Sequence, residues 1–291
     1  MNVRRLAVLL LCALAAQLPA RATTAAEEDL AALVARQQPL LEQAAAKQTP
    51  AELEDLRPRF QKLVHDYEAL LARHPGFAAA HASYGLLLAN PVVGERKQAA
   101  VQLLAANRLD PDIPLVKNQL GNFLAEEGKP LEALHYYLEA VALAPREPLY
   151  HHQIGTLLVE ARDTFIGSGQ WTRQKLDDAM LDAFAEAADL APDRFDHAYR
   201  HAMAHYDLAE PEWPAALELW RELQERAETA ADRQLLQLHE ANVLGKLGQP
   251  AQARALLRKV TEPALAVQKQ KLLVELAPPK APATVPVDAA P

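Results

Sequence analysis

A near-constant spacing of prolines is the strongest constraint on how this chain folds. Pro75, Pro111 and Pro145 are 36 and then 34 residues apart, and each follows a segment rich in alanine and leucine. Because the residue before a proline avoids the α-helical region, each of these prolines marks the end of a helix. We therefore expect a helical unit of about 34 residues that recurs along the chain.

The unit is clearest in residues 115–145, which we interpret as two helices joined by a turn at Gly128. Gly121 and Ala133 are small where two antiparallel helices would approach most closely. Larger apolar residues recur at intervals of three and four, as one buried helix face requires: Leu120, Leu124, Leu134, Tyr137 and Leu138. Gly128 is expected to end the first helix with a positive φ. One such hairpin cannot bury its apolar face alone, so stacked copies are expected.

This arrangement of residues resembles the tetratricopeptide repeat (TPR), a helix–turn–helix unit that stacks on copies of itself. The resemblance covers roughly residues 52–260 and implies an all-α fold, a TPR-like right-handed superhelix of antiparallel helix hairpins. Within a repeat domain over 23–276, the expected units are 27–75, 78–111, 114–145, 148–192, 195–228 and 232–260, followed by a capping helix over 264–276.

The start of the chain is typical of a bacterial secretory signal peptide. Residues 2–5 are basic, residues 6–18 are apolar, and Ala20-Arg21-Ala22 fits a cleavage site with small residues. We expect residues 1–22 to be removed on export to the periplasm or beyond, which leaves no membrane span; an uncleaved anchor is the alternative. The single cysteine, Cys12, lies in this segment, so the mature chain would have no thiol chemistry. Residues 277–291, rich in proline and alanine, are expected to be disordered.

Composition and motifs narrow the function further. The formal net charge is −8, which does not favour a nucleic-acid partner. The sequence has no glycine-rich phosphate loop and no GxSxG elbow. We therefore expect neither enzymatic activity nor a cofactor.

In tetratricopeptide repeats the first helix of each hairpin lines a groove that binds peptides. Transferred position by position, this resemblance implies a groove formed by Asn118, Asn122, His152, Thr156, Tyr199, Met203, Tyr206 and Asn242. Asparagine amides can both donate to and accept from an extended backbone, which suits a peptide or protein partner. One subfamily grips a terminal carboxylate with basic residues, but Ala82, Leu86 and Leu149 occupy those positions here. Lys117 or Arg200 could still meet acidic groups.

The fourth unit carries about thirteen residues more than a regular repeat, within 161–175. This insertion contains Phe165 and Trp171 among glycines. Because binding residues often lie on loops held by a rigid scaffold, we consider these two rings as a loop contact for a partner. The alternative is that both rings pack onto neighbouring helices.

His197, His201 and His205 follow each other at intervals of four on one predicted helix. That spacing places imidazoles on adjacent turns, where they could chelate a divalent metal. The competing interpretation is packing, because His201 and His205 align with Leu120 and Leu124 of the regular unit, and no HExxH motif accompanies them. The sequence thus favours a protein-interaction scaffold of the bacterial cell envelope, with a metal- or small-ligand-binding repeat protein as the alternative.

Overall fold

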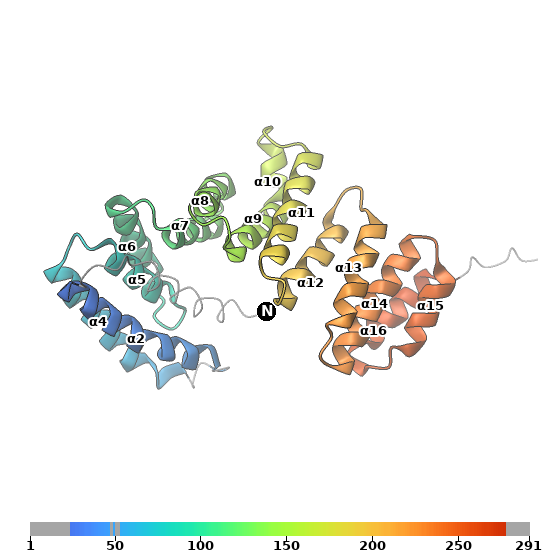
Figure 1. Cartoon of the computed structure of the whole chain (residues 1–291), viewed down its shortest axis with the longest axis horizontal. Coiled ribbons are helices and arrows are strands. Elements are labelled where there is room, and N and C mark those ends of the chain that lie inside the picture. Colours follow the sequence, from blue (N-terminus) through green and yellow to red (C-terminus); the bar gives the residue numbers. More distant parts are fainter. Residues whose placement is uncertain (1–23, 47–48, 50–52, 278–291) are drawn as a thin grey trace, which may run out of the picture. The chain divides into compact units, whose positions relative to one another are not determined.

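The computed structural model describes residues 24–46, 49 and 53–277, and every regular element within these ranges is a helix (Figure 1). The predicted all-α class is confirmed. The predicted signal peptide lies outside the described residues, as does the predicted tail apart from Ala277. Within the described part, no helix combines the length and the apolar character needed to cross a membrane.

The chain forms two compact units, Met1–Leu176 and Asp177–Pro291. The first contains the start of α11 (Arg173–Leu190) and, before it, α2 (Ala25–Ala46), α4 (Arg57–Arg73), α5 (Ala78–Ala89), α6 (Arg96–Leu109), α7 (Pro114–Glu126), α8 (Pro130–Leu143), α9 (Pro148–Glu160) and α10 (Arg162–Gly167). The second contains the rest of α11, then α12 (Phe195–Ala204), the 3₁₀ turn η1 (His205–Asp207), α13 (Trp213–Glu225), α14 (Ala230–Lys246), α15 (Pro250–Lys259), the 3₁₀ turn η2 (Pro263–Leu265) and α16 (Ala266–Glu275).

Prolines and glycines set the helix boundaries. Helices α7, α8, α9 and α15 each begin with a proline, whose fixed φ suits the first helical position and whose missing N–H costs nothing there. Gly128 has the predicted positive φ, at 73°, and Gly248 has a φ of 71°. After each glycine the next backbone N–H returns to the preceding helix, from Lys129 to the Leu124 carbonyl and from Gln249 to the Leu244 carbonyl. The turns α7–α8 and α14–α15 are therefore closed in the same way.

The hairpin α7–α8 is closed by contact between a glycine and an aromatic ring. A Cβ atom at Gly121 would lie 2.5 Å from the Cε1 atom of Tyr137 and 3.2 Å from the Ala133 carbonyl oxygen. Ala133 and Ala140 are fully buried on the same helix as Tyr137. A Cβ atom at Gly85 of α5 would lie 2.9 Å from the Cγ atom of Leu103 of α6. Small residues on the first helix thus admit large ones from the second.

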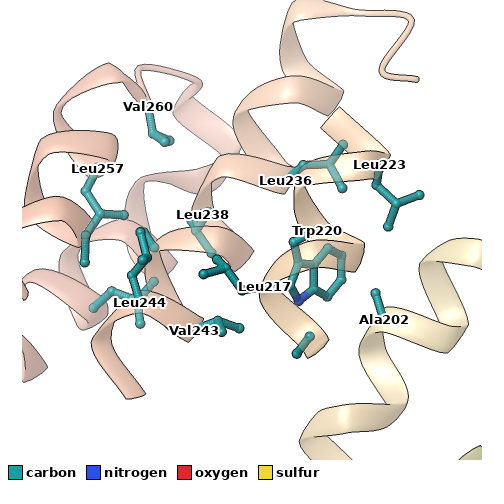
Figure 2. Packing of buried hydrophobic residues seen from close by; sticks show 14 of the residues in the cluster. Ala202, Leu217, Trp220, Leu223, Leu236, Leu238, Val243, Leu244, Leu257 and Val260 are labelled. Carbon is teal, nitrogen blue, oxygen red and sulfur yellow. The ribbon is translucent and has the colours of Figure 1, made fainter. Parts of the chain in front are cut away.

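The core of the second unit is centred on a tryptophan. Trp220 of α13 is fully buried, and Figure 2 shows it with Leu217 between Ala202 of α12 and Leu238 of α14. Leu257 of α15 and Leu272 of α16 belong to the same cluster, so one continuous apolar core joins α12 to α16. This is how a repeat fold obtains stability: each helix pair supplies the apolar partner for the next one.

We predict that Gly121→Val lowers the free energy of unfolding by about 1–3 kcal/mol, because the added side chain overpacks the site that Tyr137 fills. Gly167→Val, at the end of α10, is the matched control, since a Cβ there meets nothing within 4 Å. Urea denaturation of both variants measures the difference. Equal stability of the two variants would contradict the packing argument.

Candidate functional site

The first helices of three consecutive hairpins are joined by apolar contacts in the first unit. Leu115 of α7 and Leu149 of α9 are buried in one cluster, and Leu86 of α5 packs against it. This cluster thus connects α5, α7 and α9. The predicted residues Asn118 and Asn122 lie on α7, and His152 and Thr156 lie on α9.

Asn118 and Asn122, one helical turn apart, have very different surroundings. The Asn122 Oδ1 atom accepts a hydrogen bond from the Tyr137 hydroxyl at 2.6 Å, and its Nδ2 atom lies 3.4 Å from Gln119 Oε1. Asn118 is 0% exposed rather than open to solvent, and neither its Oδ1 nor its Nδ2 has a hydrogen-bonding partner. A buried amide without partners costs about 1–3 kcal/mol per unsatisfied group. Such a group in a folded protein calls for an explanation.

The other predicted groove residues of this unit are less distinctive. His152 and Thr156 are half-buried, and the His152 side chain already interacts with another group of the protein. Lys117 pairs with Glu139 at 2.8 Å, and its ammonium group lies over the Tyr136 ring. This lysine is therefore engaged within the fold.

The insertion after α9 forms the short helix α10 rather than a loop throughout. Phe165 is fully buried and meets the Trp171 ring edge-on, with centroids 5.6 Å apart. Helix α10 packs against α8 and α9. Phe165 therefore serves as an anchor for the insertion, and only Trp171 keeps an exposed part.

In the second unit, Tyr199 and Tyr206 converge on a histidine of the neighbouring first helix. The Tyr199 hydroxyl lies 2.9 Å from the Nε2 atom of His239 on α14, and the Tyr206 hydroxyl lies 3.4 Å from the His239 carbonyl oxygen. The His239 ring stacks on Trp220 with centroids 4.2 Å apart and a 9° interplanar angle. The tyrosines therefore fix α12 and η1 against α14.

We call this surface the α12/α14 face; it consists of Tyr199, Met203, Tyr206, Trp213, His239 and Asn242. Met203 and Trp213 are half-buried against the core, and the Tyr206 ring is 5.7 Å from that of Trp213. Asn242 is a side-chain hydrogen-bonding partner of Tyr206. Four of the six residues were predicted from the sequence, whereas His239 and Trp213 were not.

Burial controls the protonation of the histidines on this side of the unit. It lowers the pKa of His239 to about 4, and burial together with the neighbouring His201 lowers the pKa of His205 to about 4. Burial also lowers the pKa values of His197 and His201. At neutral pH these side chains are uncharged and contribute as packing and hydrogen-bonding groups.

The expected histidine row on a single helix needs correction. Helix α12 ends at Ala204, and His205 begins the 3₁₀ turn η1, where its backbone stays right-handed with a φ of −60° and a ψ of −27°. The His201 and His205 rings lie 5.9 Å apart, and His197 is 4% exposed. Among the described residues, no group of three or more His, Cys, Asp or Glu side chains is placed to hold a metal ion.

Arg200, the basic residue of α12, is engaged within the fold. Its guanidinium group lies 4.1 Å from the centroid of the Phe184 ring and pairs with Asp207 at 3.2 Å. Neither Arg200 nor Lys117 of the first unit is thus presented as a free cation. A surface of this kind does not favour an acidic ligand.

Comparison with known proteins supports the fold. No family model and no curated protein matches the sequence. Among solved structures, pilF of Pseudomonas aeruginosa is 18% identical, with a TM-score of 0.56 over 85% of this chain and 99% of that one. PilW, described as a widely conserved type IV pilus biogenesis factor, is 14% identical, with a TM-score of 0.56 over 87% and 100%. YrrB, described as a TPR protein with an unusual peptide-binding site, is 16% identical, with a TM-score of 0.55 over 70% and 97%.

The chain therefore has the tetratricopeptide-repeat fold, as its residue pattern predicts. At these identities the likeness establishes architecture. The repeat scaffold is shared by proteins with many different partners, so function has to be argued from the faces described above.

We predict that His239→Phe reduces the loss of stability on acidification. The unfolded chain binds a proton at this position below about pH 6.5, whereas folded His239 does so only near pH 4, so the folded state loses stability as the pH falls between these values. From pH 7.5 to 5, the drop in unfolding free energy should be smaller in the variant by about 1–2 kcal/mol.

The exposed Leu138 of α8 provides the control, Leu138→Phe, which changes no titratable group, so its pH dependence should follow that of the unchanged protein. Urea denaturation at the two pH values measures all three proteins. If His239→Phe loses as much stability as the control, the histidine is not kept neutral by the fold.

Proposed function

We propose that this protein is a protein-interaction scaffold of the bacterial cell envelope that binds an extended segment of another protein along its first helices. In the first unit the binding face consists of Asn118, Asn122, His152 and Thr156 on α7 and α9. The α12/α14 face, with Tyr199, Met203, Tyr206 and Asn242, is a surface of the same type in the second unit. The proposal assigns no catalytic residue and no cofactor.

The observation that carries this proposal is the buried Asn118 amide, whose donor and acceptor both lack partners. An extended backbone offers a carbonyl and an N–H side by side, which is the pair of groups that one asparagine side chain can satisfy. Because Asn118 has no exposed surface in the free protein, a bound segment has to displace the side chains that cover it. Its pairing with the amide would then remove the cost of two unsatisfied polar atoms, each of about 1–3 kcal/mol. The neighbouring, partly exposed Leu86 supplies apolar surface for its side chains.

Two further observations support location in the envelope. The first residues have the basic, apolar and small-residue order of an export signal. One of the structurally similar proteins, PilW, is described as a type IV pilus biogenesis factor. Because Lys117 pairs with Glu139, the proposed ligand is a neutral or apolar segment rather than an acidic one.

We predict that Asn118→Leu has opposite effects on folding and on binding. Replacement of an unpaired buried amide by an apolar side chain of similar size should raise the free energy of unfolding by about 1–2 kcal/mol. It should also reduce capture of an envelope partner, because the pairing groups are lost. Crosslinking and affinity capture from envelope extracts, quantified by mass spectrometry against the unchanged protein, measure binding; urea denaturation measures stability.

Asn107→Leu on α6, a second helix, is the matched control and should capture the same partner as the unchanged protein. Full capture by a stable Asn118→Leu variant would overturn the assignment of this face. Failure of the unchanged protein to enrich any envelope protein would count against the scaffold function as a whole.

A further inference from the structure

The described part of the chain ends beside the α12/α14 face. Leu276, the residue after α16, packs closely on Gly245 of α14. A Cβ atom added to Gly245 would lie 2.6 Å from the Cδ2 atom of Leu276. Arg254 of α15 fixes the same point by donating to the Leu276 carbonyl oxygen at 2.6 Å. Gly245 follows Asn242 by three residues on α14, so the two share one side of the helix.

The sequence beyond this point has an unusual composition. Residues 278–291 read PPKAPATVPVDAAP and contain five prolines, with Lys280 and Asp288 as the only charged side chains. Such segments favour the polyproline II conformation, which is extended and has no internal hydrogen bonds. Its carbonyl groups therefore remain available to donors of another surface.

The length of this segment is sufficient to cover the face. Gly245 and His239 are six residues apart on α14, or about 9 Å along the helix axis. Fourteen residues in the polyproline II conformation span about 43 Å. The segment is thus long enough to cover the face. Even if the chain reverses its direction after Leu276, the segment can extend past Asn242 and His239.

The chemistry of the face matches a proline-rich ligand. Polyproline II segments bind to surfaces lined by aromatic rings, and here Tyr199, Tyr206 and Trp213 are all half-buried residues that keep some exposed surface. The Asn242 amide can donate to a ligand carbonyl. Next to Trp213 the exposed Glu210 and Glu212 provide negative charge that would complement Lys280.

We propose that residues 278–291 bind the α12/α14 face of the same molecule in an extended, proline-rich conformation. The segment would then compete with any protein partner for binding to this face. This inference goes beyond the proposed function, because it concerns the occupant of the second unit's face and does not depend on Asn118.

The test uses a labelled synthetic peptide of residues 278–291 and two forms of the mature protein, one complete and one ending at Ala277. Fluorescence anisotropy should show saturable binding to the shortened form. We take an effective concentration of about 1 mM for the tethered segment at the face and a dissociation constant of about 100 μM for the free peptide. The complete chain should then bind the labelled peptide about tenfold more weakly than the shortened form. A peptide with all five prolines replaced by serine should not bind.

Trp213→Ala in the shortened form should weaken peptide binding, whereas Trp171→Ala, a matched change in the first unit, should not; circular dichroism verifies that both are folded. The proposal is overturned if the shortened form does not bind, if the serine peptide binds equally, or if both tryptophan variants behave alike. Sedimentation that shows a dimer for the complete chain only would assign the segment to a second copy and contradict the same-molecule form. Envelope capture through Asn118 is measured separately, so either proposal can fail while the other stands.

Discussion

The fold depends on one contact that is repeated with variations: a small residue of a first helix receives a large side chain from the second helix. Gly121 admits Tyr137, and Gly85 admits Leu103. The second unit uses Ala202 near Trp220. Because this contact brings two helices together along one side, the opposite side of each first helix remains for contacts outside the hairpin. On α7 the candidate face borders the hairpin contact, because Asn122 accepts a hydrogen bond from Tyr137 of α8.

Much of the architecture was predictable because its determinants are local. Proline spacing marks helix ends, and Gly128 has the positive φ that its position after a helix predicts. Such signals depend on the backbone preferences of one or two residues. Long-range structure was not needed to interpret them.

The candidate faces were only partly predictable, because partners distant in sequence determine them. Asn118 and Asn122 look equivalent in the sequence, yet only Asn122 is reached by the Tyr137 hydroxyl. His239 lies in a polar stretch without any motif, and only the packing of α12 on α14 brings Tyr199 to it. The histidine spacing predicted three residues on one helix, but the helix ends at Ala204 and His205 lies in the 3₁₀ turn that follows.

The Tyr137–Asn122 hydrogen bond has a consequence for how such a protein can diversify. Tyr137 fills the space beside Gly121 and also donates a hydrogen bond to the Asn122 amide. A change at Asn122 therefore removes a hydrogen bond from a side chain that packs in the core. Asn118 has no such bond and can be exchanged for an apolar side chain of similar size without breaking a hydrogen bond of its amide. Within one turn of α7, the chain thus places an amide that is tied to the second helix beside a buried amide that no hydrogen bond holds.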